Sequence, residues 1–174
     1  YNKRLDGESK DNIDFYKHPK EYKSDFERFT KVADIAIMGH FHANEAPTIL
    51  SQEMLNASNC KIKVVADISC DVNGPVACTL RATTIEEPFY GYLPSSHTEV
   101  DLFHPAAIVV MAVDNLPCEL PKDASEGFGH QFMTSVIPAF MNGDANEILS
   151  RAQITENGKL TPKFSYLQAY VDGE

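Results

Sequence analysis

Three short apolar runs divide the first two thirds of the chain, and each run ends in a polar or glycine-containing loop. They occupy residues 33–38, 61–68 and 106–113, with a brief helical segment over residues 51–56 between the first two. The third run is continuous and β-branched, which is typical of a strand buried on both faces of a parallel sheet. The pattern predicts an α/β architecture with flanking helices.

The N-terminal 30 residues show a different pattern. Residues 1–17 are polar and carry no helical stripe, so we expect an irregular lead-in. From Pro19, aromatic side chains at Tyr22, Phe26 and Phe29 follow the spacing i, i+4 and i+7, and Pro19 suits a first helical position. A surface helix is therefore predicted to begin at Pro19.

The segment between the second and third apolar runs alternates short apolar and polar stretches over residues 78–94. Residues 94–97 have the composition of a turn. We expect this segment to make a small excursion at the carboxyl end of the sheet.

The last third of the chain predicts a long helix followed by a helix–hairpin–helix segment. Asp123 with Glu126 three residues later has the spacing of a capping box, and Pro138 must kink or end the helix before Gly143 stops it. Residues 145–153 then have a helical pattern, residues 157–158 form an Asn-Gly hairpin signal, and residues 161–162 begin a final helix.

Composition narrows the class of protein. The chain has 174 residues with 15 Lys and Arg against 25 Asp and Glu, a formal charge of −10, which disfavours nucleic acid as a partner. No run reaches the roughly 20 apolar residues of a membrane span and the N-terminus lacks a signal peptide, so we expect no membrane partner and a cytoplasmic location. Because the chain begins at Tyr1 without Met, a processed or truncated product is expected.

The four cysteines indicate neither a zinc site nor a redox motif. Their spacings contain no C-x₂-C pair, so reduced thiols are expected at Cys60, Cys70, Cys78 and Cys118.

Three loops contain the candidate ligand-binding and acid/base residues, because ligands of open parallel sheets bind beyond the carboxyl ends of the strands. They begin at Gly39, at Ser69 and at Asp114. Asp114 ends an apolar run, where an acid is costly unless it is paired or faces a cleft. Two interpretations are open: Asp114 caps the following turn, or it faces a ligand. Asp67 and Asp71 are conceivable acid/base carboxylates, although turn chemistry is the commoner role for such a pair.

Two further motifs bear on the chemistry. Residues 39–42, Gly-His-Phe-His, resemble the last metal-binding motif of calcineurin-like metallophosphoesterases, but the upstream motifs of that family are absent, and a simple loop role for His40 and His42 is favoured. No Gly-x-Gly-x-x-Gly follows a strand, and Gly127 and Gly129 lie within the predicted long helix. The chain therefore lacks a phosphate-cradling loop of its own.

Ordered motifs give the chain a resemblance to a known family. They are Val-Ala-Asp-Ile-Ser-Cys-Asp at 65–71, Ala-Thr-Thr-Ile-Glu-Glu-Pro at 82–88, and Val-Asp-Asn-Leu-Pro at 113–117 with Leu-Pro-Lys-Asp-Ala-Ser-Glu at 120–126. The chain resembles the C-terminal portion of saccharopine dehydrogenase or lysine-ketoglutarate reductase, within the alanine dehydrogenase/transhydrogenase superfamily.

The resemblance implies a domain arrangement and a set of partners. Residues 1–118 would be the latter part of a Rossmann-like nucleotide-binding domain with a partial parallel sheet, and residues 119–174 a tail that crosses back to the catalytic domain. The implied cofactor is NAD or NADP. The implied partners are an amino acid and 2-oxo acid substrate, the missing N-terminal portion of the same enzyme, and further copies in a homo-oligomer.

The resemblance also assigns site residues. The loop that borders the nicotinamide matches Val113, Asp114, Asn115 and Leu116. His40 lies about where a residue after the preceding strand contacts the cofactor, although the family usually has an apolar residue there. The family's catalytic residues precede this segment, so no catalytic residue is assigned, and no metal site is expected.

Three classes of function are therefore considered. The favoured one is the C-terminal part of an NAD(P)-dependent oxidoreductase of the saccharopine or alanine dehydrogenase type, inactive on its own. The others are a metal-dependent phosphoesterase based on residues 39–42 and a non-catalytic α/β module used for assembly.

Overall fold

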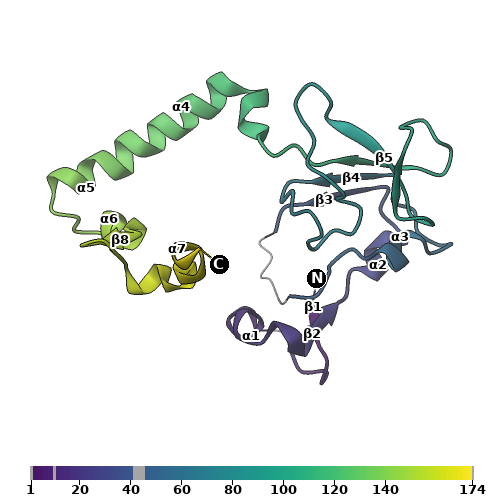
Figure 1. The fold of residues 1–174 in the computed structure, drawn as a ribbon, viewed down its shortest axis with the longest axis horizontal. Helices are drawn as coiled ribbons and strands as arrows, with labels where there is room; N and C mark the ends of the chain where they lie inside the picture. The colour runs from purple at the N-terminus through teal and green to yellow at the C-terminus, as the bar shows by residue number, and fades with distance from the viewer. Residues whose placement is uncertain (1, 10, 41–45, 174) are drawn as a thin grey trace. The chain divides into compact units, whose positions relative to one another are not determined.

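The computed structural model describes residues 2–9, 11–40 and 46–173, and it divides the chain into two compact units, Tyr1–Glu119 and Leu120–Glu174. Each unit has its own secondary structure (Figure 1).

A five-stranded mixed sheet forms the centre of the first unit, in the order β3-β4-β7-β5-β6. The three apolar runs supply the parallel strands β3 (Ile35–Met38), β4 (Val64–Asp67) and β7 (Ile108–Met111). A hairpin of β5 (Phe89–Leu93) and β6 (Thr98–Val100) joins antiparallel to β7. The predicted α/β class and the three strands are confirmed.

The position of the hairpin differs from the excursion that was expected for residues 78–94. Residues 89–93 do not make an excursion beyond the sheet but pair with β7 along its length, from Phe89 opposite Met111 to Tyr92 opposite Ile108. Alternating aromatic side chains explain the pairing, because Tyr90 and Tyr92 point to the same face of the sheet and are both buried. The turn expected at residues 94–97 is present between the two strands.

One face of the sheet carries the hydrophobic core. Alternate residues of the strands point to it, and the short helices α2 (Glu27–Thr30) and α3 (Gln52–Leu55) lie on this side (Figure 1). The Ser51 side chain caps α3 by accepting a hydrogen bond from the Met54 N–H over 3.4 Å. The strand residues in the core are Ala36, Met38, Val65, Tyr90, Tyr92, Ile108 and Val110.

The opposite face of the sheet is apolar but largely uncovered. Ile35 is 60% exposed and Ile37 is 74% exposed, although both belong to a strand. Phe89 on β5 is 50% exposed. A parallel sheet is normally covered on both faces, so this face is unusual for the architecture.

The N-terminal segment differs from its prediction. The helix expected from Pro19 is instead a short 3₁₀ turn, η1 (Pro19–Glu21), followed by strand β2 (Tyr22–Ser24) and α2. The predicted loop contains β1 (Asn2–Arg4), which pairs antiparallel with β2, and helix α1 (Asn12–Lys17). Pairing with β1 overrides the helical spacing, because it buries Tyr22 to 3% exposure.

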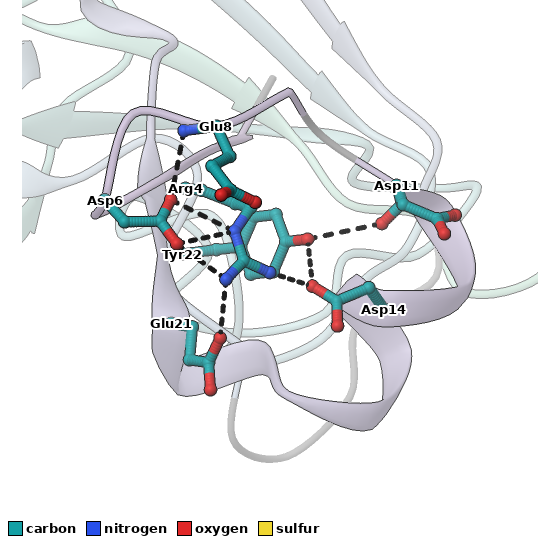
Figure 2. A network of polar contacts seen from close by, with 7 residues as sticks. All are labelled: Arg4, Asp6, Glu8, Asp11, Asp14, Glu21 and Tyr22. Atoms are coloured by element: carbon teal, nitrogen blue, oxygen red, sulfur yellow. Dashed lines mark hydrogen bonds and ion pairs between the residues drawn. The ribbon is translucent and has the colours of Figure 1, made fainter.

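A charged network around Arg4 holds this N-terminal segment together (Figure 2). The guanidinium pairs with Asp6 at 2.7 Å, with Glu21 at 3.0 Å and with Asp14. Tyr22 donates its hydroxyl proton to Asp14 over 2.6 Å. The hydrogen bond from Arg4 is the main reason why the pKa of Asp6 falls to about 2. One cation thus links β1, α1, η1 and β2.

The second unit begins with a long helical segment. Helix α4 (Pro121–Gln131) runs into a π-helical turn, η3 (Phe132–Val136), and then into α5 (Ile137–Met141). Pro138 lies at the start of α5, and it lacks the N–H that a continuous α-helix would use, so the predicted interruption is confirmed. The predicted capping box is wrong. Leu120 is the N-cap and Pro121 the first helical residue, which places Asp123 inside the first turn.

The rest of the second unit follows the predicted helix–hairpin–helix order. Gly143 has a φ of 71° after α5, and it is followed by α6 (Ile148–Ala152). The Asn-Gly pair connects β8 (Thr155–Glu156) to β9 (Lys159–Leu160), both turn residues having positive φ. The chain ends in η4 (Pro162–Leu167) and α7 (Gln168–Asp172).

The first unit also has a short 3₁₀ helix at its end, η2 (Leu116–Glu119). It follows β7 directly through a turn at residues 114–115. This junction is the last part of the first unit before Leu120.

Candidate functional site

The carboxyl ends of β3, β4 and β7 lie at the same edge of the sheet, because the three strands are adjacent and parallel. The Ile68 N–H, just after β4, donates to the Met38 carbonyl oxygen at the end of β3 over 2.7 Å. Gly39 then passes beside Ile68, whose Cβ would be 3.8 Å from a Cβ built on Gly39. The expectation that the three loops form one rim is confirmed.

Asp67 organises the loop after β4. Its side chain is fully buried, and it accepts hydrogen bonds from the Ser69 N–H at 3.1 Å and the Ser69 hydroxyl at 2.6 Å. Its second oxygen accepts the Thr79 hydroxyl proton at 2.6 Å. These bonds engage both carboxyl oxygens, so the geometry favours turn chemistry over acid/base work for Asp67. Asp71 is exposed.

Cys70 joins the loop after β4 to the end of β7. Its Sγ lies 3.1 Å from the Val113 carbonyl oxygen and 3.2 Å from that of Asp67. Its φ of 54° turns the loop sharply, which is uncommon for a residue other than glycine. Burial raises the pKa of the Cys70 thiol, and the charges of Asp67, Asp114 and Asp71 raise it further.

Thr83 fixes the end of β7 from the other side. Its N–H donates to the Ala112 carbonyl oxygen at 2.8 Å, and its hydroxyl oxygen accepts the Ala112 N–H at 3.0 Å. A parallel bridge pairs Thr83 with Val113. Both residues are about 1% exposed, so the backbone beneath the Asp114 turn is held rigidly.

The predicted site residues occupy this edge in different ways. Val113 is buried and its carbonyl oxygen accepts the Cys70 thiol proton, whereas Asp114 and Asn115 form an exposed turn. Leu116 is half-buried and begins η2. The Asp114 carboxylate accepts no hydrogen bond within the described part of the chain, so the capping role is not observed.

His40 follows β3 and is half-buried. It borders a hollow of about 320 Å³ together with Phe26, Ile37, Met38 and Gly39. Because β3 is an end strand of the sheet, this hollow lies at the edge where β3 has no strand neighbour on one side among the described residues. Ligands of open α/β sheets bind in such crevices beyond strand ends.

Neither a metal centre nor a phosphate cradle is found in the part of the chain that the structure describes. Those residues contain no group of three metal-ligating side chains, and Phe41 and His42 of the phosphoesterase-like motif lie outside them. Gly127 and Gly129 lie within α4 as expected. The described residues therefore contain no glycine-rich loop of the kind that binds a pyrophosphate.

Sequence reasoning missed the two threonines that organise this edge. Thr79 and Thr83 are each about 1% exposed, and their hydroxyl groups fix Asp67 and Ala112. Thr83 belongs to the motif at 82–88, but no pattern within the sequence indicated what its side chain contacts. Their partners are between 12 and 29 residues away along the chain.

The mixed sheet with its flanking helices defines an α/β domain of the Rossmann-like class. The sequence profile of the family described as "Alanine dehydrogenase/PNT, C-terminal domain" matches residues 9–163. The chain belongs to this family. The predicted resemblance is thereby confirmed.

Several curated relatives are similar to most of the chain. "Alpha-aminoadipic semialdehyde synthase" of Arabidopsis thaliana is 30% identical over 164 residues, which is 90% of this chain and 15% of that protein. "Alpha-aminoadipic semialdehyde synthase, mitochondrial" of Rattus norvegicus is 28% identical over 190 residues, 91% of this chain and 20% of that protein. "Saccharopine dehydrogenase [NAD(+), L-lysine-forming]" of Candida albicans is 29% identical over 124 residues, 70% of this chain and 30% of that protein. The chain therefore spans less than a third of the length of these relatives.

Within the described residues, no helix combines the length and the apolar composition needed to span a bilayer.

Proposed function

We propose that this chain is the C-terminal part of an NAD(P)-dependent amino-acid dehydrogenase of the saccharopine type. The reaction would be the reductive condensation of lysine with 2-oxoglutarate, or its reverse. One structural observation carries the proposal: three adjacent parallel strands end at a rigid edge beside a 320 Å³ hollow. The names of the relatives support a saccharopine rather than an alanine substrate.

In this proposal the chain supplies one wall of the cofactor site. Val113 would border the nicotinamide with its backbone, Leu116 would add apolar contact, and His40 would line the hollow at the end of β3. The described residues fit this partial role, because they form a rigid edge but contain no glycine-rich cradle for the pyrophosphate. Another part of the polypeptide would bind the pyrophosphate.

Asp114 is the side chain best suited to act on the bound cofactor. It is exposed at the end of a buried strand, and its carboxylate is not engaged by a hydrogen bond within the described residues. It could therefore accept a hydrogen bond from the carboxamide of the nicotinamide, or orient a catalytic side chain from the rest of the enzyme. Asn115, beside it in the same turn, can both donate and accept.

The chemistry itself would be shared between the cofactor and residues elsewhere. When bound, the nicotinamide supplies or accepts the hydride, and the protein holds the reacting carbons together and excludes water. Residues 1–118 would act as the latter part of the nucleotide-binding domain, and residues 119–174 as a tail that crosses back to the catalytic domain. No residue of this chain is assigned a catalytic role, and the isolated chain would be inactive.

The remaining parts of the proposal concern the whole enzyme. It would use NAD or NADP, work together with its own N-terminal portion, and could form a homo-oligomer. We place it in the cytoplasm, whereas the rat relative is named as a mitochondrial protein. Cell fractionation of the natural protein, followed by assays with both cofactors, tests these points.

The experiment for the site uses the natural polypeptide that contains this sequence. Asp114→Ala is expected to weaken reduced-cofactor binding about tenfold or more, since a hydrogen bond to a charged group contributes roughly 1.5–3 kcal/mol. Fluorescence titration measures the affinity, and turnover is assayed with lysine and 2-oxoglutarate and with pyruvate and ammonia. Asp123→Ala, an exposed carboxylate in α4, is the matched control and should change neither. Unchanged affinity and turnover in Asp114→Ala would contradict the role of Asp114.

A further inference from the structure

We propose that Thr83 is a positioning residue for the cofactor site, because its hydroxyl oxygen holds the backbone that leads into the Asp114 turn and so fixes the direction of the Asp114 carboxylate. The inference rests on the proposed function, since it assumes that Asp114 acts on the bound nicotinamide. Thr83 is only 1% exposed, so its effect on a cofactor would pass through Ala112 and Asp114 and not through direct contact.

The two residues before Asp114 lie beyond the regular part of the sheet. Strand β7 pairs with β4 and with β5 as far as Met111. Ala112 and Val113 continue past that point, yet they are 0% and 1% exposed. Their backbone groups therefore need partners from outside the regular ladder, because an unpaired N–H or C=O in a buried place costs free energy.

Thr83 supplies these partners on one side of the segment. Its N–H donates to the Ala112 carbonyl oxygen over 2.8 Å, as the backbone of a neighbouring parallel strand would. Its hydroxyl oxygen accepts the Ala112 N–H over 3.0 Å and thus takes the place of a strand carbonyl oxygen. An isolated parallel bridge pairs Thr83 with Val113. Because the side chain is β-branched, its χ1 angle is restricted, which keeps the hydroxyl group directed at Ala112.

The other side of the segment depends on sulfur contacts. The Val113 carbonyl oxygen accepts the Cys70 thiol proton over 3.1 Å, and the Val113 N–H lies 3.3 Å from the Met111 sulfur. A thiol is a weak donor and a thioether is a weak acceptor. In the part of the chain that the structure describes, the Thr83 hydroxyl is therefore the strongest side-chain partner of this backbone.

Loss of the hydroxyl oxygen would be transmitted to Asp114. The Ala112 N–H would be left buried without an acceptor, and the backbone of residues 112–113 could satisfy it only by moving towards water. Asp114 follows directly in an exposed turn, so this movement would redirect its carboxylate. A shift of about 1 Å is enough to weaken an aligned contact with a bound molecule.

Titration of the natural polypeptide with NADH, and in a second series with NADPH, tests the inference by the fluorescence of the nicotinamide. Thr83→Val removes the acceptor at nearly constant shape, and we expect the Kd to rise about tenfold, which is about 1.4 kcal/mol. Thr83→Ala also lacks the acceptor and should weaken binding at least as much. Thr83→Ser keeps the hydroxyl oxygen, so its Kd should rise by less than about threefold, since only a methyl group and part of the χ1 restriction are lost. The Kd comes from the curvature of the titration and the number of sites from its end point, which separates lost affinity from lost folded protein.

Thr30→Val is the matched control. Thr30 is also fully buried, at 0% exposure, and its hydroxyl group donates to the Glu27 carbonyl oxygen over 2.9 Å. It ends α2 and precedes β3, so it lies on the side of the amino ends of the parallel strands. Thr30→Val should lower the melting temperature and leave the Kd unchanged. An equal rise of the Kd in Thr30→Val would show that Thr83 acts through general stability, which overturns the inference.

A double variant shows whether Thr83 acts through Asp114. Thr83→Val should raise the Kd by less than about twofold when it is added to Asp114→Ala, because the carboxylate that Thr83 positions is already absent. A full tenfold rise in that background overturns the inference. So does an unchanged Kd in Thr83→Val, or an equal rise in Thr83→Val and Thr83→Ser.

These outcomes are separable from a failure of the proposed function. If Asp114→Ala by itself leaves the cofactor affinity unchanged, the proposed role of Asp114 fails and this inference fails with it. If Asp114→Ala weakens binding but Thr83→Val does not, this inference alone fails and the cofactor site stands.

Discussion

The Cys70 thiol lies 3.1 Å from the Val113 carbonyl oxygen and donates a hydrogen bond to it. The two residues are 43 positions apart in the sequence, and they link the loop after β4 to the end of β7. This contact ties the loop after β4 to the end of β7 at the edge where the parallel strands end.

Cysteine reactivity should follow burial and charge at this edge. Burial raises the pKa of Cys70, as do three neighbouring carboxylates, and burial raises the pKa of Cys78 to about 12. Both thiols should therefore react slowly with iodoacetamide at pH 7.5, since the thiolate is the nucleophile. Cys118 is exposed and should be alkylated first. Timed alkylation with peptide mass mapping gives the order, and faster labelling of Cys70 than of Cys118 would contradict the prediction.

Removal of the Asp67 carboxyl group should destabilise the first unit. Asp67→Ala leaves the Ser69 and Thr79 hydroxyl groups without their acceptor in a buried region, which should cost on the order of 3 kcal/mol. Asp67→Asn keeps one acceptor oxygen and should cost less. Urea denaturation measures the free energy of unfolding of both variants. Equal losses for the two would mean that volume, and not hydrogen bonding, is what Asp67 supplies.

Protonation of Asp6 at low pH should destabilise the N-terminal segment. Its pKa falls from 3.8 to about 2, first because of the hydrogen bond from Arg4 and then because of the Glu8 N–H. The folded state thus binds fewer protons than the unfolded state, so the stability that this group contributes is complete above about pH 4 and is lost as the pH falls through 2. Urea midpoints between pH 7 and pH 2 measure the effect.

Asp6→Asn should flatten that part of the pH profile, because the group can no longer ionise. Asp123→Asn, which removes an exposed carboxylate from α4, is the control and should leave the profile unchanged. A profile that falls equally steeply between pH 4 and pH 2 in Asp6→Asn would show that another group is responsible.

Two glycines should respond to alanine in opposite directions. A Cβ on Gly91 in β5 would lie 2.6 Å from the Asp101 carbonyl oxygen and 2.9 Å from that of Val100, so Gly91→Ala should destabilise the hairpin by about 1–3 kcal/mol. A Cβ on Gly127 meets no atom within 4 Å, and Gly127→Ala should stabilise α4 by roughly 0.5–1 kcal/mol. Thermal unfolding of both variants checks the pair, and a stabilising Gly91→Ala would contradict the close approach of β5 to residues 100–101.

The local sequence pattern was sufficient to predict those elements whose signal lies within their own residues. The β-branched run that became β7 and the Asn-Gly turn between β8 and β9 each carry their signal within a few positions. The order of the three parallel runs also placed Gly39, Ser69 and Asp114 at one edge, because parallel strands end on the same side.

Long-range contacts decided the rest. Tyr22 has helical spacing but lies in a strand, because β1 pairs with β2 and Asp14 accepts its hydroxyl proton. Likewise, no short window of sequence specifies that Thr79 meets Asp67 or that Cys70 meets Val113. The sequence by itself determined the fold class, the strands of the parallel core and the family resemblance, since hydrophobic periodicity and motif order are local properties. Only the tertiary structure decided the N-terminal pairing, the antiparallel hairpin and the hydrogen bonds that make the edge rigid, because those depend on which distant segments meet when the core is buried.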